Sequence, residues 1–130
     1  MQNKPLISCV DDDLAVRDGI EAFLDASGFD TEFFSSAEEF LKAGRLELTS
    51  CLITDVMLGG MSGLQLQERL VSSGMKIPII VITAFPNDWI RTKTLGAGAI
   101  CFLDKPVRAE DLLAGIGLAL KSRADGETST

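Results

Sequence analysis

Histidine is missing from this 130-residue chain. Its absence removes imidazole as a general base, as a zinc ligand and as a phosphorylated side chain. Cysteine is scarce: Cys9, Cys51 and Cys101 lie in or beside strand-like runs, show no CxxC spacing and are odd in number. We therefore interpret them as small buried apolar residues and not as metal ligands or disulfide partners.

Positive charge and long apolar runs are also limited. The chain carries 12 Lys and Arg against 19 Asp and Glu, a formal charge of −7, which disfavours direct binding to nucleic acid or to an anionic membrane surface. Apolar runs such as IIVI and AICFL are far too short to span a bilayer, and the start, MQNKPLISC, lacks the apolar region of a signal peptide. We expect a cytoplasmic protein with no direct contact to nucleic acid or membrane.

Strand-like and helix-like segments alternate along the chain. Five short apolar runs recur: LISCV, TEFF, CLIT, IPIIVIT and AICFL. The segments between them carry apolar residues at helical spacing: Val16, Ile20, Phe23 and Leu24; Leu66, Leu70 and Val71; Leu112, Leu113, Ile116 and Leu120. This alternation predicts an α/β fold with a single doubly wound, five-stranded parallel sheet and helices on both faces.

Boundary signals agree with the alternating pattern. Gly28 and Gly74 stand where helix C-termini are expected, and Ser36 with Glu39 predicts a capping box at the start of the second helix. We expect one domain over residues 1–122, followed at 123–130 by a polar tail or the start of a linker.

Polar side chains gather where the predicted strands end. The first strand is followed by Asp11, Asp12 and Asp13, the third ends at Asp55, the fourth at Thr83 and the fifth runs to Lys105. Each has a simpler interpretation when taken alone, and Asp13 in particular is expected to be a helix N-cap. Their coincidence favours a binding site, because ligands of parallel sheets bind at the carboxyl ends of the strands.

The side chains at this edge suit phosphoryl transfer. Neighbouring carboxylates repel one another and need a cation, and oxygen ligands without histidine or thiolate suit Mg²⁺. A carboxylate on the neighbouring strand can act as a nucleophile, while Mg²⁺ and a lysine neutralise the charge of the phosphoryl oxygens. Thr83 would add a hydroxyl donor and Lys105 an ammonium. The residues therefore predict a phosphoryl-acceptor site.

Four motifs, VDDD, ITDVMLGGMSGL, VITA and FLDKP, occur in an order that resembles the receiver domain of two-component response regulators, in the FixJ and NarL type. The resemblance covers Leu6 to about Lys121. It implies a flavodoxin-like (βα)5 fold with strand order 2-1-3-4-5. It also implies a signalling module, not a turnover enzyme, that accepts a phosphoryl group from a histidine kinase.

The resemblance assigns roles to the residues of the acidic edge. Asp55 would be the phosphorylated aspartate, and Asp11 and Asp12 would hold Mg²⁺ together with the backbone carbonyl of Met57. Asp12 and Asp13 are also adjacent, so they are the alternative choice for the acidic pair that holds Mg²⁺. We prefer Asp11 and Asp12 because they follow Val10 directly.

The same resemblance identifies a switch and an output surface. Thr83 would be the switch hydroxyl, Phe102 the switch aromatic, and Lys105 the phosphate-binding lysine that precedes a cis peptide bond to Pro106. The surface built from the fourth helix, fifth strand and fifth helix would then bind a second copy or an effector. Phe85, Trp89 and Ile90 are expected near this surface.

The loop after the third strand departs from the family pattern. Gly59 and Gly60 stand where a proline is common, so we expect this loop to be mobile until metal and phosphate order it. Met57 and Phe85 are bulky and apolar at positions that influence access of water to the acyl phosphate. They favour slower hydrolysis.

Two alternatives remain. A haloacid-dehalogenase-like, Mg²⁺-dependent phosphatase also uses a strand-end aspartate, and DDD contains the D-x-D motif that it needs. Two residues after that motif such enzymes usually have Thr or Val, whereas this chain has Ala15. A phosphorylation-independent interaction module is expected to lose an acid, the hydroxyl or the lysine, all of which are present.

Overall fold

The computed structural model describes residues 4–128, with side chains up to residue 122. The strands are β1 (Leu6–Val10), β2 (Asp30–Phe34), β3 (Thr49–Asp55), β4 (Ile79–Thr83) and β5 (Cys101–Asp104). The helices are α1 (Leu14–Ala26), α2 (Ala37–Ala43), α3 (Gly63–Ser72), α4 (Asp88–Gly96) and α5 (Ala109–Thr128), with a short 3-10 helix, η1 (Leu46–Leu48), before β3. No described helix is both long and apolar enough to cross a membrane.

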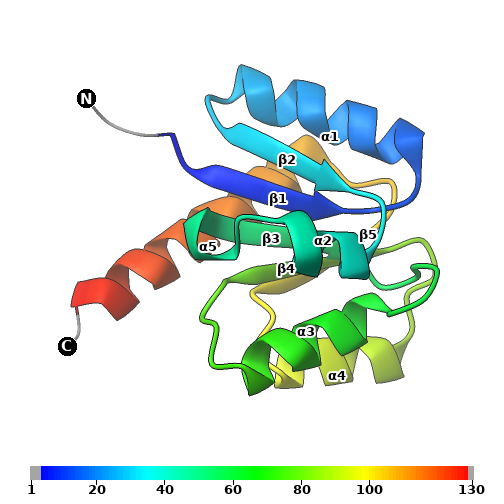
Figure 1. Cartoon of the computed structure of the whole chain (residues 1–130). Helices are drawn as coiled ribbons and strands as arrows, with labels where there is room; N and C mark the ends of the chain where they lie inside the picture. The colour runs from blue at the N-terminus through cyan, green and yellow to red at the C-terminus, as the bar shows by residue number, and fades with distance from the viewer. Residues whose placement is uncertain (1–3, 129–130) are drawn as a thin grey trace.

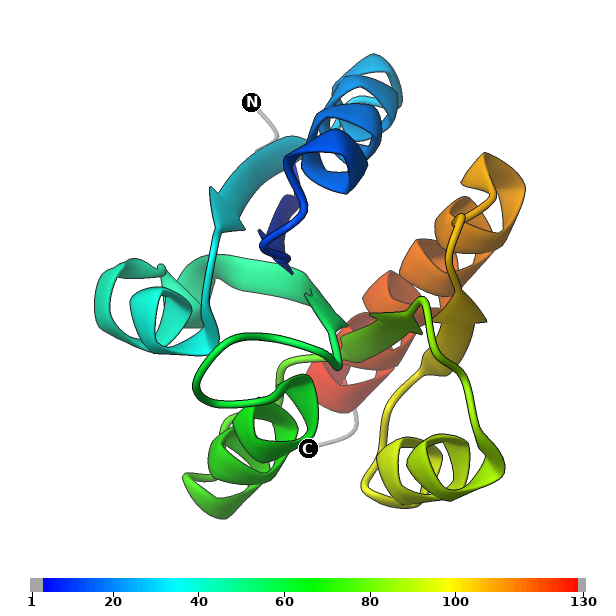
Figure 2. The ribbon, with the colours of Figure 1, turned by 90° about the vertical axis from the view of Figure 1, so that its right-hand side faces the viewer.

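All five strands are parallel and lie in the order β2-β1-β3-β4-β5, which confirms the predicted fold. The strands point toward the same edge of the sheet (Figure 1), and Figure 2 looks onto that edge. The chain leaves β1 for β2 on one side and later returns to place β3 on the other side of β1. The carboxyl ends of β1 and β3 therefore flank the point of reversal at which such sheets bind ligands.

The sheet separates two apolar layers. On one face it packs against α1 and α5 through Ile20, Leu24, Leu112 and Ile116. On the other face α2 and α3 contribute Phe40, Leu66 and Leu70. Because β1 and β4 are covered on both faces, every residue in them is buried, which explains why the sequence shows continuous apolar runs there and no alternation.

Helix ends follow the sequence signals closely. The Asp13 carboxylate accepts hydrogen bonds from the backbone N–H groups of Ala15 and Val16 and so caps α1, as predicted. Gly28 and Gly74 follow the C-caps of α1 and α3 with φ of 89° and 78°, a backbone region that glycine enters without steric cost.

The capping box predicted at α2 forms only in part. Ser36 accepts a hydrogen bond from the Glu39 N–H, but the described contacts contain no return bond from the Glu39 side chain. A reciprocal box does form one helix later, where Ser62 caps the Gln65 N–H and the Gln65 side chain accepts from the Ser62 N–H. The spacing of Ser and Glu or Gln in the sequence is the same at the starts of α2 and α3, so it does not predict which helix forms the reciprocal box.

Several sequence-based placements need correction. Val71 and Leu113, which fit the helical spacing, are 56% and 39% exposed, because the buried stripes of α3 and α5 are narrower than their apolar patterns. Trp89 and Ile90 lie within the first turn of α4 and not before it. Helix α5 extends as far as Thr128, so the boundary near residue 122 and the role of residues 123–130 as a polar tail or the start of a linker stay predictions; residues 129–130 lie outside the described part.

Candidate functional site

Three carboxylates converge at the carboxyl ends of β1 and β3. Asp11 follows β1 directly and Asp55 is the last residue of β3; they are 5% and 4% exposed, whereas Asp12 is exposed. One carboxylate oxygen from each of the three lies within 4.8 Å of the others. Asp13 is not part of this group, since its side chain caps α1. The geometry thus favours the Asp11 and Asp12 register over the alternative with Asp13.

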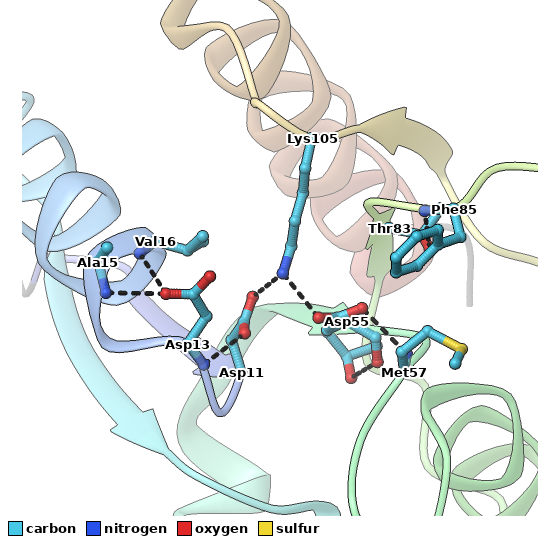
Figure 3. Close-up of polar contacts among 10 residues, drawn as sticks. Asp11, Asp13, Ala15, Val16, Asp55, Met57, Thr83, Phe85 and Lys105 are labelled. Carbon is cyan, nitrogen blue, oxygen red and sulfur yellow. Dashed lines mark hydrogen bonds and ion pairs between the residues drawn. The ribbon is translucent and has the colours of Figure 1, made fainter.

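Lys105 reaches into this pocket from the end of β5 (Figure 3). Its Nζ lies 2.7 Å from Oδ2 of Asp55 and 2.8 Å from Oδ2 of Asp11. The side chain is 12% exposed, so the ammonium pairs with both buried carboxylates away from most solvent. The Lys105–Pro106 peptide bond is cis. Three carboxylates against one ammonium leave the pocket with a surplus of negative charge.

Burial and pairing act in opposite directions on the pKa values of these groups. Burial raises the pKa of Asp11, and the close Lys105 ammonium and a hydrogen bond from the Asp13 backbone oppose that effect only in part. Burial by itself would lower the pKa of Lys105, but its close contacts with the Asp11 and Asp55 carboxylates outweigh burial and raise this pKa. Lys105 is therefore held in its charged form as the counter-ion of the pocket.

Backbone donors orient the two buried carboxylates. The Asp13 N–H donates to Asp11 Oδ1 at 2.9 Å, and the Met57 N–H donates to Asp55 Oδ1 at 3.0 Å. Asp11 Oδ2 is buried and makes an ion pair with Lys105 but no hydrogen bond of suitable geometry. A buried acceptor oxygen with unused capacity, inside a set of donors made only of oxygen, fits a hard divalent cation such as Mg²⁺.

Thr83 and Phe102 lie on the neighbouring strands β4 and β5. Thr83 is buried at the end of β4, and its Oγ1 accepts a hydrogen bond of 3.1 Å from the Phe85 N–H. Phe102 is 7% exposed, and the Arg91 guanidinium of α4 lies 5.8 Å from the centre of its ring. Phe102 is therefore packed inward beneath α4.

Two apolar side chains stand at the rim of the pocket (Figure 3). Met57 lies two residues after Asp55, and its side chain is 59% exposed; the side chain of Phe85, two residues after Thr83, is 72% exposed. Both side chains are far more exposed to solvent than Asp55 and Thr83, the last residues of β3 and β4.

The loop between β3 and α3 is held at both ends. The Gly63 N–H donates to the carbonyl of Val56 at 3.0 Å, which closes the loop at its base. A side chain at Gly63 would clash with the carbonyl oxygen of Asp55, so the start of α3 packs directly on the backbone of the candidate site.

A contact that the sequence did not indicate holds the far part of this loop. Oε2 of Glu38, in the first turn of α2, accepts a hydrogen bond of 2.9 Å from the Met61 N–H. In the sequence Glu38 resembles any acidic residue in the first turn of a helix, where it interacts favourably with the helix dipole. No pattern links it to a loop 23 residues further along.

Comparison with known proteins identifies the family. A sequence model of the response regulator receiver domain family matches residues 7–117. The chain is 41% identical over 116 residues to the response regulator protein TmoT of Ectopseudomonas mendocina, covering 89% of this chain and 53% of that protein. It is 31% identical over 121 residues to the transcriptional regulatory protein FixJ of Bradyrhizobium diazoefficiens, covering 93% and 59%.

Solved structures agree with the sequence comparison. The response regulator StyR superimposes with a TM-score of 0.89 at 38% identity, covering 98% of this chain and 64% of that one. The chain spans about half the length of the curated relatives it matches. Fold, acidic pocket and family match together place this chain among the response regulator receiver domains, the phosphoacceptor modules of two-component signal transduction.

Proposed function

We propose that Asp55 is the residue that accepts the phosphoryl group and that a sensor histidine kinase supplies it. The observation that carries this assignment is the position of Asp55. It is a buried carboxylate at the end of β3, 2.7 Å from the Lys105 ammonium and grouped with Asp11 and Asp12. A carboxylate oxygen of Asp55 forms a bond to phosphorus as the bond between phosphorus and the donor breaks.

Asp11, Asp12, Asp55 and the Met57 carbonyl would hold Mg²⁺ in this pocket. When bound, Mg²⁺ supplies positive charge close to the phosphoryl oxygens. Lys105 orients and neutralises the group from the opposite side, and its raised pKa keeps it charged for that purpose. Thr83 would donate its hydroxyl to a phosphoryl oxygen in place of accepting from the Phe85 N–H.

The output would leave through α4, β5 and α5. A Thr83 hydroxyl drawn toward the phosphoryl group changes the packing beside Phe102, and Phe102 is covered by Arg91 of α4. Trp89, 60% exposed in the first turn of α4, would contribute to a surface for a second copy or an effector. The related FixJ is a transcriptional regulatory protein, so we infer that this receiver, over residues 1–122, takes part in the control of transcription in the cytoplasm.

Phosphorylation with a small phosphodonor tests the assignment. Wild type incubated with acetyl phosphate and Mg²⁺ should gain one phosphoryl group by intact mass, and the group should be stable in acid and labile in base. Asp55→Asn should gain none, while Asp104→Asn, which changes an exposed carboxylate at the end of β5, should behave like wild type. Equal labelling of Asp55→Asn and wild type would refute the role of Asp55.

A further inference from the structure

Glu38 of α2 holds the loop that carries Met57, although it lies outside the acidic pocket. The loop runs beside α2 in Figure 2, and the Met61 N–H donates to Glu38 Oε2 at 2.9 Å. This hydrogen bond lowers the pKa of Glu38, so the side chain is a carboxylate at neutral pH. Met61 is partly buried against the core, which fixes the distance between the loop and α2.

The loop has little conformational restraint of its own at this point. Gly59 and Gly60 precede Met61, and two adjacent glycines have more accessible backbone conformations than any other pair. Gly60 adopts φ of 77°, and a Cβ at this residue would lie 2.6 Å from Glu38 Oε2. The glycine therefore allows the carboxylate to approach the backbone closely. The absence of a side chain at Gly60 thus makes room for the Glu38 carboxylate, which in turn binds the next residue, Met61.

The same loop begins at the candidate metal site. The Met57 N–H donates to Asp55 Oδ1, so a change in the loop path alters both the orientation of Asp55 and the direction of the Met57 carbonyl. Beyond Met57, residues 58–61 are joined to other elements in the described part of the chain by the apolar packing of Leu58 and Met61 and by the Glu38 hydrogen bond. Its loss would free the two glycines to take other conformations.

We propose that Glu38 is a positioning residue for the phosphoacceptor site: by binding the Met61 N–H it keeps the diglycine loop in the path from which the Met57 carbonyl would reach Mg²⁺. The inference rests on the proposed function, since it assumes that this carbonyl contributes to Mg²⁺ binding. Glu38 lies outside the group of carboxylates that would hold the metal. It acts by raising the fraction of molecules whose loop is ready to bind, and apparent affinity scales with that fraction.

Matched variants on both sides of the contact provide the test. Glu38→Ala removes the acceptor, and Glu39→Ala, its neighbour in the first turn of α2, removes the same charge without touching the loop. Glu38→Gln removes the charge but keeps an acceptor oxygen. Gly60→Ala obstructs the contact from the loop side and also strains the backbone at φ of 77°, whereas a Cβ at Gly59 meets no atom within 4 Å, so Gly59→Ala adds a methyl to the same loop without either effect.

Two measurements are needed: exchange of the Met61 amide without metal, and Mg²⁺ affinity by isothermal titration calorimetry. Glu38→Ala and Gly60→Ala should speed exchange of the Met61 amide and weaken Mg²⁺ binding by roughly three- to tenfold, in proportion to the lost competent fraction. Glu38→Gln, Glu39→Ala and Gly59→Ala should stay within about twofold of wild type. Such a pattern supports positioning through the hydrogen bond.

Other patterns separate this inference from the proposed function. If wild type binds Mg²⁺ and Glu38→Ala binds it equally well, the contact is only structural and the inference is wrong. Equal weakening in Glu39→Ala or Glu38→Gln would assign the effect to charge and would also overturn it. If wild type itself does not bind Mg²⁺, the proposed function fails and the role of Glu38 fails with it.

Discussion

The Lys105 ammonium lies 2.7 Å from Oδ2 of Asp55 and, with the same nitrogen, 2.8 Å from Oδ2 of Asp11. One cation thus neutralises the proposed phosphoacceptor and a proposed metal ligand together. A ligand that enters the pocket must share these carboxylates with Lys105. The lysine therefore affects metal binding as well as phosphate recognition.

Lys105→Met should bind Mg²⁺ more tightly than wild type while being less stable without metal. Removing a positive charge from beside the ion should raise affinity roughly five- to tenfold, since unit charges 4 Å apart interact by about 1 kcal/mol even in water. The metal-free variant should lose about 2 kcal/mol of unfolding free energy, because two buried carboxylates lose a charged partner. Calorimetry and urea unfolding measure the two effects.

Lys76→Met is the matched control for this charge change. Lys76 is exposed and precedes β4 at the opposite edge of the sheet, so its loss should leave both quantities nearly unchanged. A weaker Mg²⁺ affinity in Lys105→Met would show that the lysine supports the metal and does not compete with it.

Gly63→Ala should destabilise the protein and disturb Asp55. The added methyl would clash with the Asp55 carbonyl oxygen, which belongs to rigid backbone at the end of β3, and such overpacking costs about 1 to 3 kcal/mol. The measurement is urea unfolding together with the amide chemical shifts of β3. Gly19→Ala in α1 is the control, since its methyl meets no atom within 4 Å and should stabilise by about 0.5 to 1 kcal/mol.

The convergence of acids and lysine was predictable because the carboxyl ends of parallel strands share one edge. Asp11, Asp55 and Lys105 follow buried runs whose type and order are clear in the sequence. The double ion pair of Lys105 was not predictable, because it depends on strand register and on the path of a long side chain. Strand alternation sets which edge a residue occupies, but not which atoms meet there.

Contacts between distant elements were the least accessible to sequence reasoning. Glu38 and Met61 are joined by one side-chain hydrogen bond between a helix and a loop, and neither residue belongs to a repeating pattern. The exposure of Val71 had a similar origin, because the width of a helix's buried stripe depends on how its neighbours pack. Such features follow from the assembled fold and not from local periodicity.

The three thiols should differ in reactivity. Burial raises the pKa of Cys51 to about 12 and that of Cys9 well above its ordinary value. Burial also raises the pKa of Cys101, but this side chain is only half-buried. Because the thiolate is the reactive form, native protein treated with iodoacetamide at pH 8 should be modified mainly at Cys101. Peptide mass spectrometry measures the distribution, and all three should react in urea.

Rapid native labelling of Cys51 would contradict this order. Cys101→Ser provides the control, since it should abolish most native labelling while leaving the fold intact. If Cys101→Ser is labelled as fast as wild type, the side of the sheet that carries Cys9 and Cys51 opens more readily than its burial implies.

Thr83→Ala should separate phosphorylation from output. The Thr83 hydroxyl accepts from the Phe85 N–H in this structure and is not needed to form the bond between Asp55 and phosphorus. Phosphorylation by acetyl phosphate should therefore persist. A phosphoryl group shifts the two-state equilibrium only through contacts that differ between the states, and the Thr83 hydroxyl would be one of them. Self-association in the presence of beryllofluoride, an acyl-phosphate mimic, should weaken at least about fivefold, or roughly 1 kcal/mol of lost coupling.

Sedimentation with and without the mimic should compare wild type, Thr83→Ala and Trp89→Ala. In Thr83→Ala the mimic should no longer strengthen association. Without the hydroxyl, binding of the mimic cannot alter the packing of Phe102, which lies beneath Arg91 of α4. Trp89→Ala should keep phosphorylation but lose association, since its ring is exposed on α4 and would contribute directly to the contact. Thr92→Ala, an exposed change one turn further along α4, should behave like wild type. If the mimic changes association equally in all four proteins, the signal does not leave through Thr83, Phe102 and α4.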